Sequence, residues 1–211
     1  MSSSAGRFYT IRSNGILRRV PLLEMSDQSF ESRICRDQSI EDLQIGKRRW
    51  ERSDLIGLRF AHGRWRELQC EEVIFNGVMW LQVEFSKVKF KNCHFSNCQF
   101  LRTHLQDADF VDCNFERVEF VNRNLASCRF AGSSFYDVDL GFAQMPGVDL
   151  SHTEWVRCRL DGADLSAANL QSARAKKTSM QGIQLTGARL QGAQFAQFSE
   201  TTDESASNKK S

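Results

Sequence analysis

Large apolar residues recur at every fifth position along most of the chain. The series begins at Ile40, ends at Phe195 and holds 32 positions, all of them apolar. From Leu68 onward, the position two residues earlier in each unit is small or β-branched, with Arg123 the one clear exception. A helix has a period of 3.6 residues and a strand a period of 2, so neither accounts for this spacing. The pattern predicts a repeat architecture in which every unit of five residues turns one large side chain inward.

Single units show a small residue, a polar residue, Leu or Phe, and then two further residues that are mostly polar or Gly. Ala163-Asp164-Leu165-Ser166-Ala167 is one such unit. The pattern resembles the pentapeptide-repeat family over residues 38–197. The resemblance implies an all-β fold, a right-handed, four-sided parallel β-helix with four units per coil. Residues 20 apart would then stack, and 32 units would make about eight coils.

This register divides the chain into three parts and defines a core. We expect an N-terminal cap or leader segment over residues 1–37, the β-helix over 38–197, and a disordered polar tail over 198–211. The predicted core has large inner residues and small inner residues. They are Phe90, Phe95, Phe100, Phe110, Phe115, Phe120, Phe130 and Phe135, with Cys93, Cys98, Cys113, Cys128 and Cys158.

The cysteines are close enough in sequence to histidines to suggest a zinc site. Cys93, Cys98 and Cys113 share a short stretch with His94 and His104. In the predicted register the cysteines point inward and the histidines outward, so the two kinds of side chain do not converge. Cys93 and Cys113 stack in neighbouring coils, which leaves a disulfide open as an alternative. We interpret these cysteines as buried small residues and expect no metal and no cofactor.

One outward column of the predicted coils is apolar. Leu81, Leu101 and Val121 follow one another at steps of 20 residues, and Phe142 lies close beyond their end. A contiguous exposed apolar patch suggests an interface. Two interpretations stay open: the column contacts a protein partner or a second copy of the chain, or residues 1–37 fold over it.

Composition and charge narrow the class of protein. The chain has 28 basic and 26 acidic residues, so no global field attracts nucleic acid. No apolar run is long enough for a secretory signal or a membrane span. Seven cysteines, an odd number, fit reduced thiols in a cytoplasmic, bacterial setting. No catalytic motif emerges, and we therefore expect a protein that is not an enzyme.

Three hypotheses for function follow. The leading one is a non-enzymatic bacterial module that presents a rigid β-helix surface to a protein partner. The second is a type III-like secreted effector, exported without a signal peptide, whose Ser-rich start is a leader and whose rod faces the host. The third, implied by the resemblance, is protection of DNA gyrase by imitating DNA. The 20 basic and 19 acidic residues of 38–197 disfavour it. Gyrase-protecting members typically end in an apolar dimerisation helix. This sequence shows none, which leaves homodimerisation open.

Overall fold

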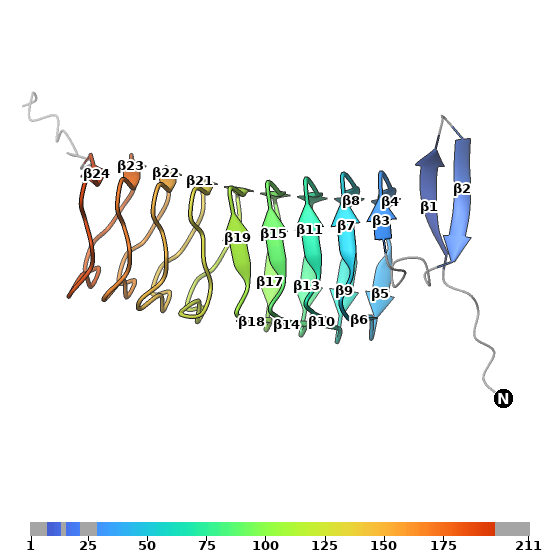
Figure 1. Cartoon of the computed structure of the whole chain (residues 1–211), viewed down its shortest axis with the longest axis horizontal. Helices are drawn as coiled ribbons and strands as arrows, with labels where there is room; N and C mark the ends of the chain where they lie inside the picture. Colours follow the sequence, from blue (N-terminus) through green and yellow to red (C-terminus); the bar gives the residue numbers. More distant parts are fainter. Residues whose placement is uncertain (1–7, 14–15, 22–28, 197–211) are drawn as a thin grey trace, which may run out of the picture.

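The computed structural model describes residues 8–13, 16–21 and 29–196. Residues 29–196 form a four-sided parallel β-helix of about eight coils, stacked side by side along one axis (Figure 1). The prediction of an all-β solenoid is confirmed. Each coil consists of four short rungs joined by tight corners, and each rung turns the middle residue of its unit inward.

The first two faces of the coil hold the first and second rungs. Face 1 begins with the strands β3 (Ser29–Glu31), β7 (Arg49–Glu51), β11 (Gln69–Glu71), β15 (Lys89–Lys91) and β19 (Asp109–Val111). Face 2 consists of β4 (Ile34–Arg36), β8 (Asp54–Ile56), β12 (Ile74–Asn76), β16 (His94–Ser96), β20 (Asn114–Glu116), β21 (Ser134–Tyr136), β22 (Glu154–Val156), β23 (Arg174–Lys176) and β24 (Gln194–Phe195). Face 2 is therefore a sheet along the whole length of the rod.

The other two faces begin as sheets and continue as single β-bridges. Face 3 begins with β5 (Ser39–Glu41), β9 (Arg59–Ala61), β13 (Met79–Leu81) and β17 (Gln99–Leu101). Face 4 begins with β6 (Gln44–Ile45), β10 (Arg64–Arg66), β14 (Glu84–Ser86) and β18 (His104–Gln106). Beyond β20, faces 1, 3 and 4 are linked by isolated bridges such as that between Glu119 and Asp139.

The register between coils is 20 residues without a slip. Phe75 pairs with Phe95, and Phe95 in turn pairs with Phe115. Backbone hydrogen bonds agree with this register: Ile74 is the ladder partner of Asp54, and its N–H donates to the carbonyl of the preceding residue, Ser53, at 2.9 Å. Every rung thus satisfies its backbone groups in the next coil, as a parallel ladder requires.

The corners depend on residues with left-handed backbone conformation. The second residue after the inner large residue has a positive φ in nearly every unit, for example 51° at Asn92 and 52° at Asn97; Lys47 and Ser127 are the exceptions. Asn, Asp and Gly accept this conformation most readily. In the C-terminal half, corners on faces 1, 3 and 4 also close with a turn hydrogen bond, such as Ala143 N–H to Leu140 O at 3.0 Å. The ladder on both sides holds these corners in place.

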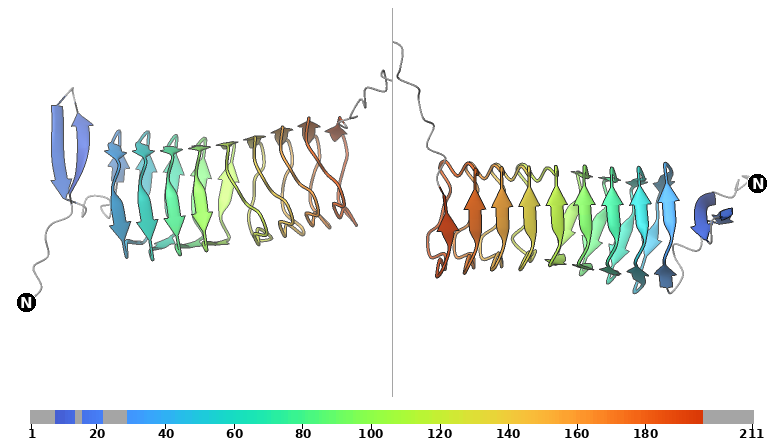
Figure 2. Two further views of the ribbon diagram at one scale, coloured as in Figure 1. Left: turned by 180° about the vertical axis from the view of Figure 1, so that it is seen from behind. Right: turned by 90° about the horizontal axis from the view of Figure 1, so that it is seen from above.

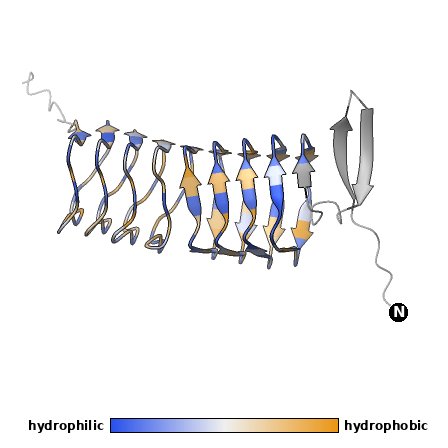
Figure 3. Ribbon diagram, viewed as in Figure 1, coloured by the Kyte–Doolittle hydropathy of each residue, from blue (hydrophilic) through white to orange (hydrophobic). Residues whose placement is uncertain are grey.

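The core is one continuous column of stacked side chains. On face 2 the rings of Phe75, Phe95, Phe115 and Phe135 stack nearly parallel, with centroids 4.8, 4.9 and 5.1 Å apart. All eight phenylalanines and five cysteines assigned to the core by the sequence lie buried. Towards the C-terminus, leucine and alanine replace the aromatic residues. Figure 3 shows the resulting alternation of apolar and polar segments around the coils.

The N-terminal part differs from the predicted division of the chain. The ladder begins at β3 rather than at residue 38, because Phe30 and Cys35 keep the register and the Arg33 N–H donates to Ser53 Oγ at 3.1 Å. Before it, β1 (Phe8–Ser13) and β2 (Ile16–Pro21) form an antiparallel hairpin beside β4, at the end of the rod (Figure 2). The predicted disordered tail, 198–211, lies outside the described residues.

Candidate functional site

The apolar column expected from the sequence forms a stripe on face 3. Leu81 of β13 and Leu101 of β17 are direct partners in the ladder, and Val121 lies on the next rung. Leu101 is 38% exposed, while Leu81 and Val121 are half-buried. Met79, at the other end of the same strand, is half-buried as well. We call Leu81, Leu101 and Val121 the apolar stripe.

The apolar stripe ends at a small buried residue on each side. Ala61, the ladder partner of Leu81 on the N-terminal side, is buried at 1% exposure, and Gly141 is buried one rung beyond Val121. Phe142 follows at the corner with a φ of 55° and is 53% exposed. Its ring lies over Gly162, where any added side chain would collide with it. The surface therefore gains a large exposed aromatic side chain next to the C-terminal end of the stripe.

The described N-terminal hairpin does not cover the apolar stripe. Strands β1 and β2 lie beyond the first coil, at the end of the rod, whereas the stripe runs along its side (Figure 1). Residues 1–7 and 22–28 are outside the described part of the chain. Of the two interpretations left open by the sequence, coverage by residues 1–37 therefore finds no support in the placement of β1 and β2.

A polar hollow borders the apolar stripe at the corner between faces 3 and 4. The hollow has a volume of about 540 Å³ and is lined by His62, Arg64, Gln82, Glu84, Arg102 and His104, among others. A second hollow of about 460 Å³ shares Glu84 and His104 with it. Gln82 and Arg102 directly follow Leu81 and Leu101 in the chain, so stripe and hollow are continuous. We call the surface made by both the face 3/4 corner.

The face 3/4 corner is the part of the site that the sequence analysis missed. Its side chains stand at two places in each unit, the corner residue and the residue before the inner large one. Sorting all charges by face, instead of following single columns, would have found it. Residues 59–66, 79–86, 99–106 and 119–126 contain five arginines and two glutamates. The rest of the same coils, residues 67–78, 87–98, 107–118 and 127–138, contains five basic and eight acidic residues. The coils are thus basic on one side and acidic on the other.

The cysteines are structural and chemically quiet. All seven are buried with free thiols. Burial raises the pKa of Cys98 and of Cys128 to about 12 and that of Cys158 to about 11, against opposing hydrogen bonds from backbone N–H groups of the preceding coil. The Cys98 thiol also donates to the Phe75 carbonyl at 3.2 Å. Ser133 does the same more strongly, accepting from Cys113 N–H and donating to Phe110 O at 2.9 and 2.8 Å. These small inner residues satisfy the corners that lack a turn hydrogen bond.

We therefore expect the folded protein to resist thiol reagents. All seven sulfur atoms are buried and therefore out of reach of the reagent. At pH 8 the thiols of Cys98 and Cys128, with a pKa of about 12, are in addition ionised to only about one part in ten thousand, and only the thiolate reacts. Ellman's reagent should modify none of the seven cysteines within minutes, and all seven in concentrated guanidinium chloride. A thiol that reacts rapidly in the native protein would contradict the burial of its unit.

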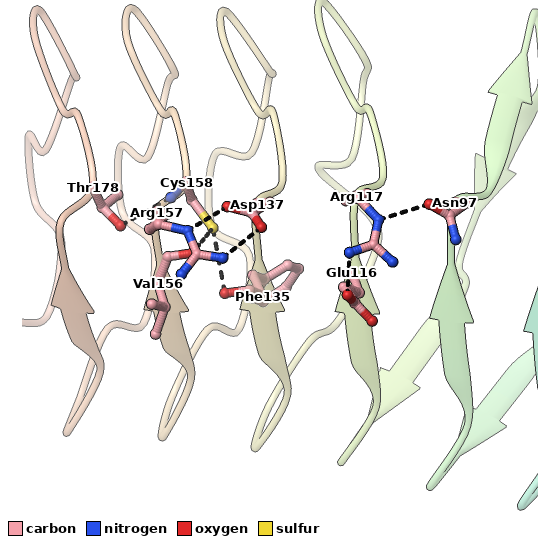
Figure 4. Close-up of polar contacts among 9 residues, drawn as sticks. All are labelled: Asn97, Glu116, Arg117, Phe135, Asp137, Val156, Arg157, Cys158 and Thr178. Atoms are coloured by element: carbon pink, nitrogen blue, oxygen red, sulfur yellow. Dashed lines mark hydrogen bonds and ion pairs between the residues drawn. The ribbon is translucent and has the colours of Figure 1, made fainter.

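Polar side chains stack in a similar way at the corner after face 2 (Figure 4). Arg157 donates to both carboxylate oxygens of Asp137, from Nε at 2.8 Å and Nη2 at 2.7 Å, and its guanidinium lies 4.0 Å from the Tyr136 ring centroid. The hydrogen bonds from Arg157 lower the pKa of Asp137. One coil further toward the N-terminus, Arg117 Nε donates to Asn97 Oδ1 at 2.7 Å. Because these groups satisfy one another between coils, the column stabilises the ladder and offers no vacant site.

No cluster of metal ligands is present in the part of the chain that the structure describes. Among those residues, no three His, Cys, Asp or Glu side chains are placed to share a metal ion. A hollow of about 920 Å³ opens at the C-terminal end of the rod, between Lys177, Thr178, Met180 and Phe195. It consists of the inner side of the last coil. Within the described ranges, no helix has the length and hydrophobicity needed to cross a membrane.

Comparison with known proteins agrees with this architecture. The family model for a pentapeptide repeat region matches residues 83–163. The model for pentapeptide repeats in eight copies matches residues 147–182 and 163–199. No curated protein matches the sequence. Together the family matches span residues 83–199, more than half of the chain.

Solved structures with a similar fold include two pentapeptide-repeat proteins. HetL from the cyanobacterium Nostoc sp. strain PCC 7120, which is involved in heterocyst differentiation regulation, shares 20% identity over 73% of this chain and 87% of its own, with a TM-score of 0.49. QnrB1, a plasmid-mediated fluoroquinolone resistance protein, shares 12% identity over 78% of this chain and 94% of its own, with a TM-score of 0.40. From the five-residue register, the four-sided coil and the two family models, we conclude that the chain belongs to the pentapeptide-repeat family.

Proposed function

We propose that the protein is a non-enzymatic binding module whose working surface is the face 3/4 corner. The observation that carries the proposal is the apolar stripe: three apolar side chains in register on the outside of a rigid ladder, beside the exposed ring of Phe142. Exposed apolar side chains gathered in this way are typical of interfaces. The polar hollow beside them supplies the rim that such interfaces usually have.

The rigidity of the rod supports a binding role. Each rung is fixed by backbone hydrogen bonds to both neighbouring coils, and the inner side chains stack without interruption. A partner that docks on this surface pays little for ordering it, since the stripe is already in place. A convex rod, in contrast, gives few polar groups the chance to converge on one reacting atom, which is why we do not propose an enzyme.

The charges disfavour imitation of DNA as the mode of binding. The densest acidic run of the sequence includes Asp109 on face 1, Asp112 at the next corner and Glu116 on face 2. On face 1, Asp109 stands between Lys89 and Arg129 in the ladder. A continuous acidic face, which imitation of DNA would require, is interrupted at every coil there.

The test is affinity capture from a bacterial lysate with quantitative mass spectrometry. We expect Leu101→Arg to fold normally, because residue 101 is exposed, and to lose the partner that the unchanged protein retains, because a charge replaces the centre of the stripe. Val111→Arg is the matched control: Val111 has the same place in its unit, on face 1, and is half-buried. Partners retained by both variants would contradict the proposed surface.

A further inference from the structure

We infer that the partner segment that binds the apolar stripe is acidic as well as apolar. This inference rests on the proposed function and adds the chemistry of the partner. Around the stripe, faces 3 and 4 carry five arginines, Arg59, Arg64, Arg66, Arg102 and Arg123, against Glu84, Glu119 and, in the polar hollow, Asp42. A segment that buries apolar side chains on the stripe therefore comes within reach of an excess of positive charge.

Within the described ranges, most of these arginines form no ion pair with a carboxylate. Arg64 Nε pairs with Glu84 Oε2 at 3.0 Å. Among the described residues, neither Arg66 nor Arg102 forms an ion pair, and the same holds for Arg59 and Arg123. Elsewhere on the rod, arginines pair with acids of the neighbouring coil, as Arg157 does with Asp137 and Arg159 with Asp139. Four arginines without an ion pair among the described residues thus lie on faces 3 and 4, around the stripe.

Arg102 is best placed to recognise a carboxylate beside the stripe. It directly follows Leu101, the most exposed residue of the stripe, and it lines the polar hollow together with His62, Gln82 and His104. Two acids, Asp42 and Glu84, line the same hollow, and Glu84 is paired with Arg64. A guanidinium group binds a carboxylate with two parallel hydrogen bonds. Imidazole and amide groups in the same hollow provide further donors. An apolar residue on Leu101 and an acid one or two positions away would use both features together.

The apolar stripe favours a protein segment over nucleic acid as the source of negative charge. Phosphates laid along this side of the rod would have to be dehydrated against Leu81 and Leu101, which offer no hydrogen bonds. A peptide meets both requirements, because one side chain is apolar and its neighbour is charged. An acidic partner would also be steered to this side and away from the acidic opposite side of the same coils.

The test is selection of short random peptides displayed on phage against the full chain at low salt. We expect enriched peptides that combine Asp or Glu with Leu, Ile or Phe, and that bind more weakly as salt is raised. Arg102→Glu should weaken these peptides by about tenfold or more. Arg129→Glu is the matched control, because Arg129 lies on face 1, with Nε 3.8 Å from Asp109; it should leave binding unchanged.

The outcomes separate this inference from the proposed function. Neutral or basic peptides that are lost on Leu101→Arg would overturn the acidic partner and leave the binding surface in place. Peptides that survive Leu101→Arg would overturn the surface itself. The acidic partner would also be overturned if the unchanged protein enriched no peptide more strongly than the Leu101→Arg, Arg102→Glu double variant does. The acidic partner would also be overturned if a fluorescent DNA oligonucleotide bound more tightly than the enriched peptides, because phosphate would then be the ligand of these arginines.

Discussion

Phe115→Asp is expected to abolish the folded state at neutral pH. The Phe115 ring lies between the parallel rings of Phe95 and Phe135, at centroid distances of 4.9 and 5.1 Å, and is 1% exposed. The substitution removes this stack and buries a carboxyl group among Phe110, Phe120 and Phe130, none of which can hydrogen-bond to it. The cost is on the order of 5 kcal/mol or more, comparable to the whole stability of many domains.

Circular dichroism with thermal and urea unfolding is the measurement for Phe115→Asp. The β signal and the cooperative transition should both be lost. Asn114→Asp, at the exposed neighbouring position, adds the same carboxylate outside the core and should shift the midpoint only slightly. A cooperative transition retained by Phe115→Asp would mean that Phe115 does not point into the column, and the five-residue register would be wrong at this unit.

Trp80→Ala is expected to cost about 3–5 kcal/mol of unfolding free energy. The Trp80 ring is fully buried, stacks on Phe100 at 4.6 Å and meets Phe60, Phe75, Phe85 and Phe95 as well. Rigid coils on both sides limit how far neighbouring side chains can move into the space that the indole leaves. The lost contacts and the remaining cavity therefore add up.

Urea unfolding of Trp80→Ala should show a lower midpoint with an unchanged slope. Trp80→Phe is the comparison variant. It retains most of the ring, and it removes the indole N–H, which has no hydrogen-bond partner among the described residues. We expect it to lose clearly less stability than Trp80→Ala, because the phenyl ring fills most of the space that alanine leaves empty. Equal losses of unfolding free energy in both variants would show that the volume of the side chain at this rung does not determine the stability.

The sequence was sufficient to predict the fold because a single rule holds along the whole rod. With one large inner residue per five and no slip, the position of each side chain follows from its number alone, and the ladder pairs such as Leu81 with Leu101 follow from a step of 20 residues. The predicted stripe could therefore be named before its neighbours were known. The start of the rod was harder to predict, because Gln28 and Arg33 interrupt the small inner positions. The ladder nevertheless already includes β3 and β4.

Other features depend on interactions that the pattern does not encode. The sequence does not show which corners close with a turn hydrogen bond, nor that Ser133 and the cysteines satisfy backbone groups of the preceding coil. The hairpin of residues 8–21 has no five-residue period. The exposed fraction of Leu101 and the place of Arg102 in the polar hollow also required three-dimensional neighbours. The fold was thus predictable from periodicity, whereas the candidate site needed distances.

The coils of the rod follow one another at a constant spacing along its axis. Successive coils lie about 4.8 Å apart, so the stripe from Leu81 to Val121 spans about 9.6 Å. Two turns of an α-helix advance about 10.8 Å, whereas two same-side steps of an extended strand advance about 13.6 Å. Over the length of the stripe, the advance of a helix laid lengthwise stays within about 1 Å of the spacing of the coils, whereas the advance of a strand does not. The spacing of the coils is therefore close to the helical pitch. A helix laid along the axis can place one side chain on each of the three coils in turn.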